Sequence, residues 1–164
     1  INRLMAEHPE WILKNDRGAP VMIDDGFEKT ACLDPSHPAM PAYLGRLYRS
    51  LRRCGFGYFK IDFLLWAPLA LAQGGRPANL RVTLLEAIRA ALRSIRTAIG
   101  PKSVLLGCGG FFPEIGAGLY DACRASVDIS SYWSNILTIA VLATLIDQVL
   151  LENLKRKVLR YQYV

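Results

Sequence analysis

Apolar residues along the chain recur with two spacings, one typical of helices and the other typical of buried strands. The helical spacing predicts a first helix from about Pro38 to Arg53, with Ser36 as a candidate cap and Gly55 just past its end. The residues expected on its inner face are Leu44, Leu47, Tyr48 and Leu51. These positions lie three or four residues apart, so they share one side of the helix.

A second helix is predicted from about Leu80 to Ile99, where Gly100 and Pro101 stop it. Its inner stripe comprises Leu80, Leu84, Ile88, Ala91, Ile95 and Ile99. Two short apolar runs, residues 58–65 and 103–108, flank this helix and are predicted to be buried strands. Between the first run and the helix, residues 66–79 are rich in Pro, Gly and Ala and are predicted to form a long loop.

Strand, loop, helix and strand in this order predict a βαβ unit with parallel strands and a right-handed crossover. A further loop and helical turn over residues 114–123 lead to a predicted short strand at about 125–129. Residues 1–37 are irregular, with a short apolar run at 21–23 that fits a strand and a turn at 24–26. The repeat indicates the α/β class, either a (β/α)8 barrel or a doubly wound sheet. Both architectures bind ligands at the carboxyl ends of their strands.

The end of the chain has a different character. Residues 136–146 form an almost uninterrupted apolar run, and residues 147–160 continue with helical spacing and a basic end. A membrane span needs about 20 apolar residues. The run is shorter than that, so we predict a buried helix and no membrane partner.

Composition indicates a folded globular chain, because 52% of its 164 residues are hydrophobic and 21% are charged. The net charge of +6 comes largely from arginines spread over the two predicted helices. No nucleic-acid-binding motif accompanies them, so we expect solvated helix faces and no nucleic-acid partner.

The four cysteines lack CxxC spacing and form no zinc pattern with the two histidines. They are predicted to be reduced thiols of a cytoplasmic protein, with no metal site.

The clearest candidate for chemistry is the pair Lys60 and Asp62 in the first predicted strand. Two residues apart on a strand, their side chains share one face. Charged residues seldom enter such an apolar run without a partner or a function. The pair is either a structural ion pair or part of a site. A second carboxylate, Asp128, follows far downstream, and two carboxylates supplied by separate strands are the equipment of a glycosidase.

Five segments in series carry a resemblance to a known family. They are His8–Trp11, Leu33–Pro38, Tyr58–Phe63, Leu106–Gly109 and Asp121–Asp128. Their order and spacing resemble the catalytic barrel of the α-galactosidases in glycoside hydrolase families 27 and 36, and family 36 more closely. The resemblance covers roughly residues 7–133. It implies a partial (β/α)8 TIM barrel over residues 1–134, consisting of central strands with their helices. Residues 135–164 do not match the family and are expected to form a helical segment.

The resemblance implies a retaining mechanism by double displacement. Asp62 would be the nucleophile that forms a galactosyl-enzyme, and Asp128 would be the acid and then the base. Lys60 beside Asp62 favours the ionised carboxylate, which suits a nucleophile. The substrate would be an α-galactoside oligosaccharide or glycoconjugate, and the chemistry needs no cofactor.

The resemblance further implies contacts with the sugar. The residues concerned are Lys60, Arg124, Cys108, Gly109, Trp11 and Trp133. Each has an alternative interpretation. Arg124 could pair with Asp121, Cys108 could be a small core residue, and the two tryptophans could be packing residues.

A complete barrel takes about 250 residues, so we expect a fragment whose 164 residues alone hydrolyse little or nothing. Open sheet edges would favour association into a homo-oligomer. Three other functions stay open. One is a galactosyl transferase of the raffinose-synthase type, another is an α-N-acetylgalactosaminidase, and the third is a non-catalytic truncated barrel that binds sugar or a partner chain.

Overall fold

The computed structural model describes residues 2–24, 26, 28–108, 113–124, 141 and 144. The chain divides into two compact units, Ile1–Ser126 and Val127–Val164. The helices and strands described lie in the first unit, and Val141 and Thr144 are the described residues of the second. None of the helices in the described ranges is long and apolar enough to cross a membrane.

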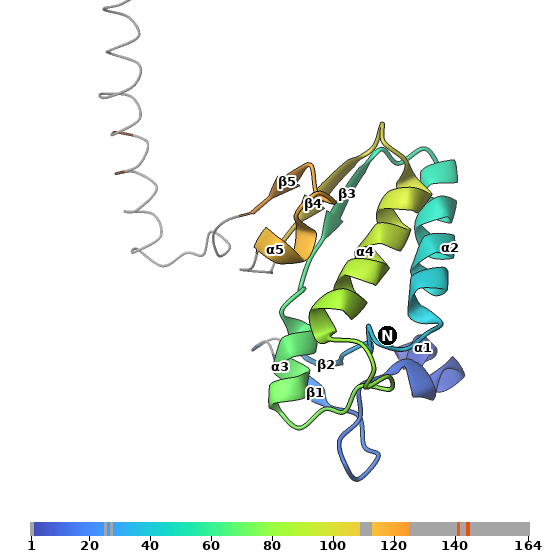
Figure 1. Ribbon diagram of the computed structural model, residues 1–164, viewed down its shortest axis with the longest axis vertical. Helices are drawn as coiled ribbons and strands as arrows, with labels where there is room; N and C mark the ends of the chain where they lie inside the picture. The colour runs from blue at the N-terminus through green and yellow to red at the C-terminus, as the bar shows by residue number, and fades with distance from the viewer. Residues whose placement is uncertain are drawn as a thin grey trace, which may run out of the picture. The chain divides into compact units, whose positions relative to one another are not determined.

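A parallel sheet forms the centre of the first unit (Figure 1). Its strands, in spatial order, are β3 (Tyr58–Ile61), β4 (Val104–Gly107) and β5 (Ala122–Cys123). The predicted parallel pairing of the first two strands is confirmed, with Lys60 opposite Leu106 in register. Within the described ranges the sheet is open, and a closed barrel is not shown. The fold is therefore a mixed α/β layer structure.

Two long helices, α2 (Met40–Arg53) and α4 (Leu84–Ile99), lie side by side and pack on one face of this sheet (Figure 1). Phe59 and Leu105, which are register partners, are buried beneath them. From α4 the core takes Ile88, Leu92, Ile95 and Ile99. Hydrophobic burial on this side of the strands holds the sheet and the helices together.

The predicted inner face of α2 is confirmed at three of its four positions. Leu44, Tyr48 and Leu51 pack against the core, whereas Leu47 is 40% exposed. The predicted cap of α2 is wrong. Ala39 occupies the N-cap without a side-chain hydrogen bond, and the Ser36 hydroxyl instead accepts a bond from the Asn79 backbone N–H at 3.1 Å.

The start of α4 differs from the prediction by one turn. Thr83 caps the helix and forms a capping box with Glu86, in which each side chain accepts a hydrogen bond from the other residue's backbone N–H. The capping box gives hydrogen-bond acceptors to backbone N–H groups at the start of the helix that would otherwise have none. A helix that began earlier would lose these two bonds. Leu80, predicted to lie on the inner stripe, precedes the helix and is 82% exposed.

The first strand is shorter than predicted and the loop after it is partly helical. β3 ends at Ile61, and α3 (Trp66–Ala72) occupies half of the predicted loop. Pro68 is the third residue of α3, where a backbone N–H has no intrahelical acceptor, so the proline costs the helix nothing. Ala67 and Ala70 are buried against the core.

The loop that follows α3 is held by Asp34, whose side chain is buried. Its carboxylate accepts hydrogen bonds from the Ser36 N–H at 2.8 Å and from the Ala78 N–H at 2.6 Å. Asp16 and Arg76 form an exposed ion pair at 2.5 Å in the same region. The Asp34–Ala78 and Asp16–Arg76 contacts could not be predicted from local sequence, because they join segments 44 and 60 residues apart.

The N-terminal region is more regular than expected. It comprises α1 (Asn2–Glu7), a 3-10 turn η1 (Pro9–Trp11), and an antiparallel hairpin of β1 (Met22–Asp24) and β2 (Lys29–Ala31). The predicted turn at 24–26 is confirmed. The Asp24 carboxylate accepts a hydrogen bond from the Gly26 N–H, and Gly26 has a φ of 88°.

After β4, the short helix α5 (Pro113–Gly116) leads into β5. The predicted strand at 125–129 lies outside the described residues, and β5 precedes it.

Two arginines of α4 contact backbone carbonyls next to β4, α5 and β5, so the predicted solvated face of this helix is solvated only in part. Arg89 donates to the carbonyls of Ile115 and Ala117. Arg96 donates to the carbonyls of Ser103 and Leu119 and to the Asp121 carboxylate.

Candidate functional site

Three predicted site residues meet at the carboxyl ends of the parallel strands. Lys60 lies in β3, Asp62 follows it, and Arg124 follows β5. The Lys60 Nζ atom is 2.8 Å from Asp62 Oδ2, and the Arg124 Nη2 atom is 4.0 Å from Asp62 Oδ1. The Lys60–Asp62–Arg124 cluster therefore places one carboxylate between two cations.

The strand register explains how residues so far apart in sequence come together. The Cys108 N–H donates to the Ile61 carbonyl at 2.7 Å, and the Arg124 N–H donates to the Gly107 carbonyl at 2.9 Å. Each strand is thus bonded to the next at its last residue. Parallel pairing then carries the residues just past β3, β4 and β5 to the same edge of the sheet.

The cluster holds Asp62 in its ionised form. Partial burial raises the pKa of Asp62, but the hydrogen bonds from Lys60 and from the Phe63 N–H, together with the charges of Lys60 and Arg124, outweigh it and the net pKa is lowered. The hydrogen bond and charge of Asp62 in turn raise the pKa of Lys60. The side chain of Asp62 is 22% exposed, so the carboxylate is reachable from solvent.

The backbone just after Asp62 is strained. Phe63 has a φ of 59°, the left-handed region that a bulky residue rarely adopts. Its N–H donates to Asp62 Oδ1 at 2.9 Å, and its ring lies 4.6 Å from that of Trp66, centroid to centroid. Such conformations cost about 1–3 kcal/mol and concentrate at functional sites. Phe63 could not be singled out from the sequence, since a phenylalanine gives no signal for a positive φ.

The structure decides one alternative for Arg124. Asp121, the other expected partner, accepts hydrogen bonds from Arg96 at 2.5 Å and from the Leu105 N–H at 2.7 Å. Arg124 instead lies toward Asp62. Cys108 directly follows β4 and is 1% exposed, so its side chain belongs to the buried layer beside the cluster.

Three predicted site residues lie outside the described residues. These are Gly109, Asp128 and Trp133. The role of Asp128 as acid and base therefore stays a prediction, as does its distance from Asp62.

Trp11 is buried in an aromatic cluster of the N-terminal region. Its ring stacks on His8 with centroids 3.8 Å apart, and Tyr43 lies 5.0 Å away. The side chain is 6% exposed. A sugar platform needs an open ring face, so this placement matches the packing interpretation.

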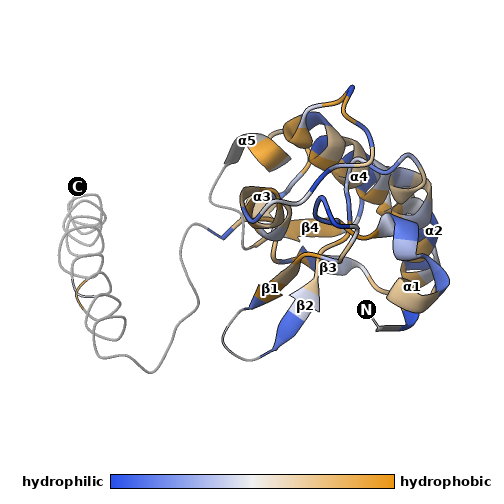
Figure 2. Cartoon of the chain, turned by 90° about the horizontal axis from the view of Figure 1, so that it is seen from below, coloured by the Kyte–Doolittle hydropathy of each residue, from blue (hydrophilic) through white to orange (hydrophobic). Residues whose placement is uncertain are grey.

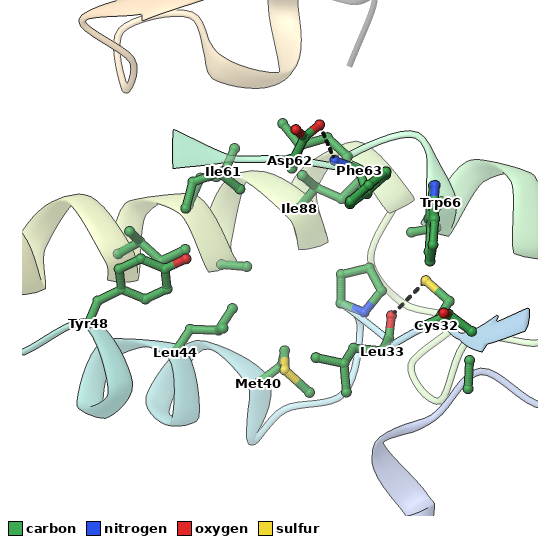
Figure 3. Close-up of a pocket in the computed structure, with 18 of the residues that line it drawn as sticks. Cys32, Leu33, Met40, Leu44, Tyr48, Ile61, Asp62, Phe63, Trp66 and Ile88 are labelled. Carbon is green, nitrogen blue, oxygen red and sulfur yellow. Dashed lines mark hydrogen bonds between the residues drawn. The ribbon is translucent and has the colours of Figure 1, made fainter. Parts of the chain in front are cut away.

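An apolar cavity of about 510 Å³ lies between α2, α4 and the segment after β3. Figure 3 shows Met40, Leu44 and Tyr48 on one side of it, with Asp62 at the opposite rim and its carboxylate directed away from them. Asp62 therefore belongs both to the charged cluster and to the rim of this cavity.

No group of three or more His, Cys, Asp or Glu residues capable of holding a metal ion occurs in the described part of the chain. The four cysteines, all described, form no disulfide. Burial, and to a smaller extent the charge of Asp34, raise the pKa of the Cys32 thiol to about 12, which makes it a poor nucleophile.

Comparisons with known proteins extend this picture. No protein-family model matches the chain. Two solved structures of an α-galactosidase from Thermus thermophilus, one in complex with stachyose and one with p-nitrophenyl α-D-galactopyranoside, are similar to it. Each is 28% identical with a TM-score of 0.63 over 79% of this chain, and the match covers 26% and 25% of those chains. The chain thus spans about a quarter of their length, and its fold is similar to part of an α-galactosidase.

Proposed function

We propose that this chain supplies part of the active site of a retaining glycosidase that acts on terminal α-galactosides, of the kind found in glycoside hydrolase families 27 and 36. The observation that carries the proposal is the Lys60–Asp62–Arg124 cluster at the carboxyl ends of parallel strands. The similarity to an α-galactosidase supports it. So does the binding of stachyose and of a galactopyranoside by those relatives.

Asp62 is the proposed nucleophile. Its carboxylate attacks the anomeric carbon, the glycosidic bond breaks, and Asp128 donates a proton to the leaving oxygen. In the second step Asp128 takes a proton from water, which displaces Asp62 and releases galactose. Retention requires the two carboxyl groups to lie about 5–5.5 Å apart.

The pKa of Asp62 fits this role. A nucleophilic carboxylate must be ionised before it attacks, and Lys60 and Arg124 favour that state. Lys60 Nζ bonds one oxygen of Asp62 and leaves further N–H donors, and its side chain is 46% exposed. We assign these donors, together with those of Arg124, to the hydroxyl groups of the sugar.

Covalent labelling tests the assignment without requiring turnover. The chain is incubated with an α-galactose-configured mechanism-based inactivator, and the product is measured by intact mass and peptide mapping. We expect one label, on Asp62, and none on the Asp62→Asn variant. The matched control is Asp24→Asn, a turn carboxylate that should leave labelling unchanged. A folded chain that takes no label, or takes it elsewhere, would contradict the proposal.

A non-catalytic sugar-binding role is the second candidate, favoured by the open three-strand sheet of the described region. It predicts affinity for galactose that survives Asp62→Asn, together with no labelling. Calorimetric titration with galactose separates the two roles. If labelling succeeds, product analysis in the presence of sucrose separates hydrolysis from transfer to a sugar acceptor.

A further inference from the structure

The two helices that cover the sheet carry many positive charges and few negative ones. The arginines of α2 are Arg46, Arg49, Arg52 and Arg53, and this helix has no acidic residue. The arginines of α4 are Arg89, Arg93 and Arg96, against the single carboxylate of Glu86. Glu86 is engaged in the capping box at the start of α4, two turns before the exposed Arg93.

The arginines divide into two groups by what they contact. Arg89 and Arg96 donate to carbonyls of the segment between α5 and β5. The guanidinium groups of Arg46, Arg49 and Arg93 make no hydrogen bond or ion pair with any other residue in the described part of the chain. Arg46, Arg49 and Arg93 are all exposed.

These three arginines line one groove between the two helices, with a volume of about 550 Å³. On each helix, the residues that line the groove lie three or four positions apart, as expected for one helix face. From α2 come Ala42, Gly45, Arg46 and Arg49, and from α4 come Ala90, Arg93, Ser94 and Thr97. No carboxylate and no aromatic ring lines this groove. Figure 2 shows the polar colouring of much of α2.

The floor of the groove is made of small residues. Gly45 is buried, and a Cβ atom there would lie 3.8 Å from the Ser94 hydroxyl oxygen. Ala42 and Ala90 are also small and line the same groove. The Ser94 and Thr97 hydroxyls add neutral donors to the same groove.

We propose that this arginine groove, lined by Arg46, Arg49 and Arg93, binds a small ligand through a diphosphate group. Guanidinium groups match the geometry of phosphate oxygens and bind them in a bidentate manner. Three arginines balance the roughly three negative charges of two linked phosphoryl groups near neutral pH. Single-stranded nucleic acid is disfavoured, because the groove offers no ring on which a base could stack.

The groove is independent of the proposed glycosidase site. It lies between the helices, while Lys60 projects from the sheet face opposite to Phe59, which packs on those helices. Arginines three residues apart on one helix repel each other and lower its stability. A bound anion removes that repulsion, so ligand binding and fold stability are coupled.

The test uses the full 164-residue chain and inorganic pyrophosphate. Isothermal titration calorimetry should show binding, and saturating pyrophosphate should raise the Tm by about 5 °C relative to sodium chloride at equal ionic strength. Arg46→Ala, Arg49→Ala and Arg93→Ala should each weaken the Kd about tenfold, the loss of one charge-assisted contact. Arg17→Ala, an exposed arginine in a turn outside the groove, is the matched control and should change nothing.

Several results would overturn the proposal. Equal stabilisation by sodium chloride, or an Arg17→Ala effect as large as those of the groove variants, would show general charge screening. Binding of single-stranded RNA or of phosphatidylserine vesicles without any binding of pyrophosphate would reject the small-ligand assignment. Circular dichroism checks the fold of each variant. If an alanine variant does not fold, the glutamine variant at that position and the ³¹P line width of pyrophosphate give the same comparison.

Discussion

The two faces of the β3–β4 pair differ in how far their side chains are buried. On one face Phe59 is 6% exposed and Leu105 is 0% exposed, and the two residues are cross-strand partners. On the other face the preceding pair, Tyr58 and Val104, is 59% and 40% exposed. Successive side chains of a strand point to opposite faces. Neighbouring residues of the strand therefore lie one in the core and one in contact with solvent.

This difference shows how stability and chemistry are divided between the faces. Parallel sheets usually bury both faces, but within the described residues α2 and α4 cover one of them. The covered face supplies the hydrophobic free energy of folding. The other face carries Lys60, which pairs with Asp62 at the strand end. The charged cluster can therefore be altered with little effect on the core.

The largest effect is expected from truncating the covered face. Phe59→Ala should lower the free energy of unfolding by about 3–5 kcal/mol, because it leaves a cavity beneath the helices. The neighbouring Tyr58→Ala, an aromatic truncation on the open face, should change it by less than about 1 kcal/mol. Urea denaturation followed by circular dichroism measures both. Equal losses would mean that the open face is covered in solution.

A smaller loss is expected from the contacts that fasten β5 to the helix layer. Arg96→Ala removes a guanidinium that bonds two backbone carbonyls and the Asp121 carboxylate. We expect a loss of about 2–3 kcal/mol, the scale for hydrogen bonds that involve a charged group. Arg93→Ala, one turn earlier and exposed, should stay within about 0.5 kcal/mol of the parent chain. Urea denaturation followed by circular dichroism measures both variants. Similar losses in the free energy of unfolding would contradict the role given to Arg96.

The smallest effect on stability, but a clear effect on ionisation, is expected on the open face. The pKa of Asp62 is below its ordinary value of 3.8, so the carboxylate is ionised above that pH. The stability that its cations contribute is present above pH 3.8 and is lost as pH falls through the lowered pKa. Lys60→Met removes a hydrogen bond and a charge, so the pKa of Asp62 should rise.

Carboxyl ¹³C chemical shifts followed through an acid titration measure this change. Lys29→Met, on an exposed position of β2, is the matched control and should leave the Asp62 titration in place. If the pKa of Asp62 is equally low in the Lys60→Met variant, then Arg124 and the Phe63 N–H alone lower it.

Local sequence patterns predicted much of this architecture. The inner positions Ile88, Ala91 and Ile95 of α4 follow directly from a spacing of three and four residues, since a helix turns every 3.6 residues. Strand geometry also predicted that Lys60 and Asp62 lie close together. Asp62 lies just past the end of β3, and the ion pair confirms that the two side chains meet. The resemblance of five segments to α-galactosidases is matched by the similarity of the fold.

Other features depended on contacts between distant parts of the chain. The helical spacing would allow α4 to begin at Leu80, but the side-chain bonds between Thr83 and Glu86 set its start. Similarly, an arginine on an exposed-looking stripe gives no sign that carbonyls more than twenty residues away lie within its reach, as they do for Arg89.

The sequence by itself determined the order of β3, α4 and β4, most of the inner positions of α2 and α4, and the closeness of Lys60 and Asp62. These depend on the periods of helix and strand, which act over a few residues. Only the tertiary structure decided that Arg124 lies toward Asp62, that Trp11 is buried and that three arginines share one groove. Each of these depends on which distant segments pack together, and hydrophobic burial in the assembled layers sets that packing.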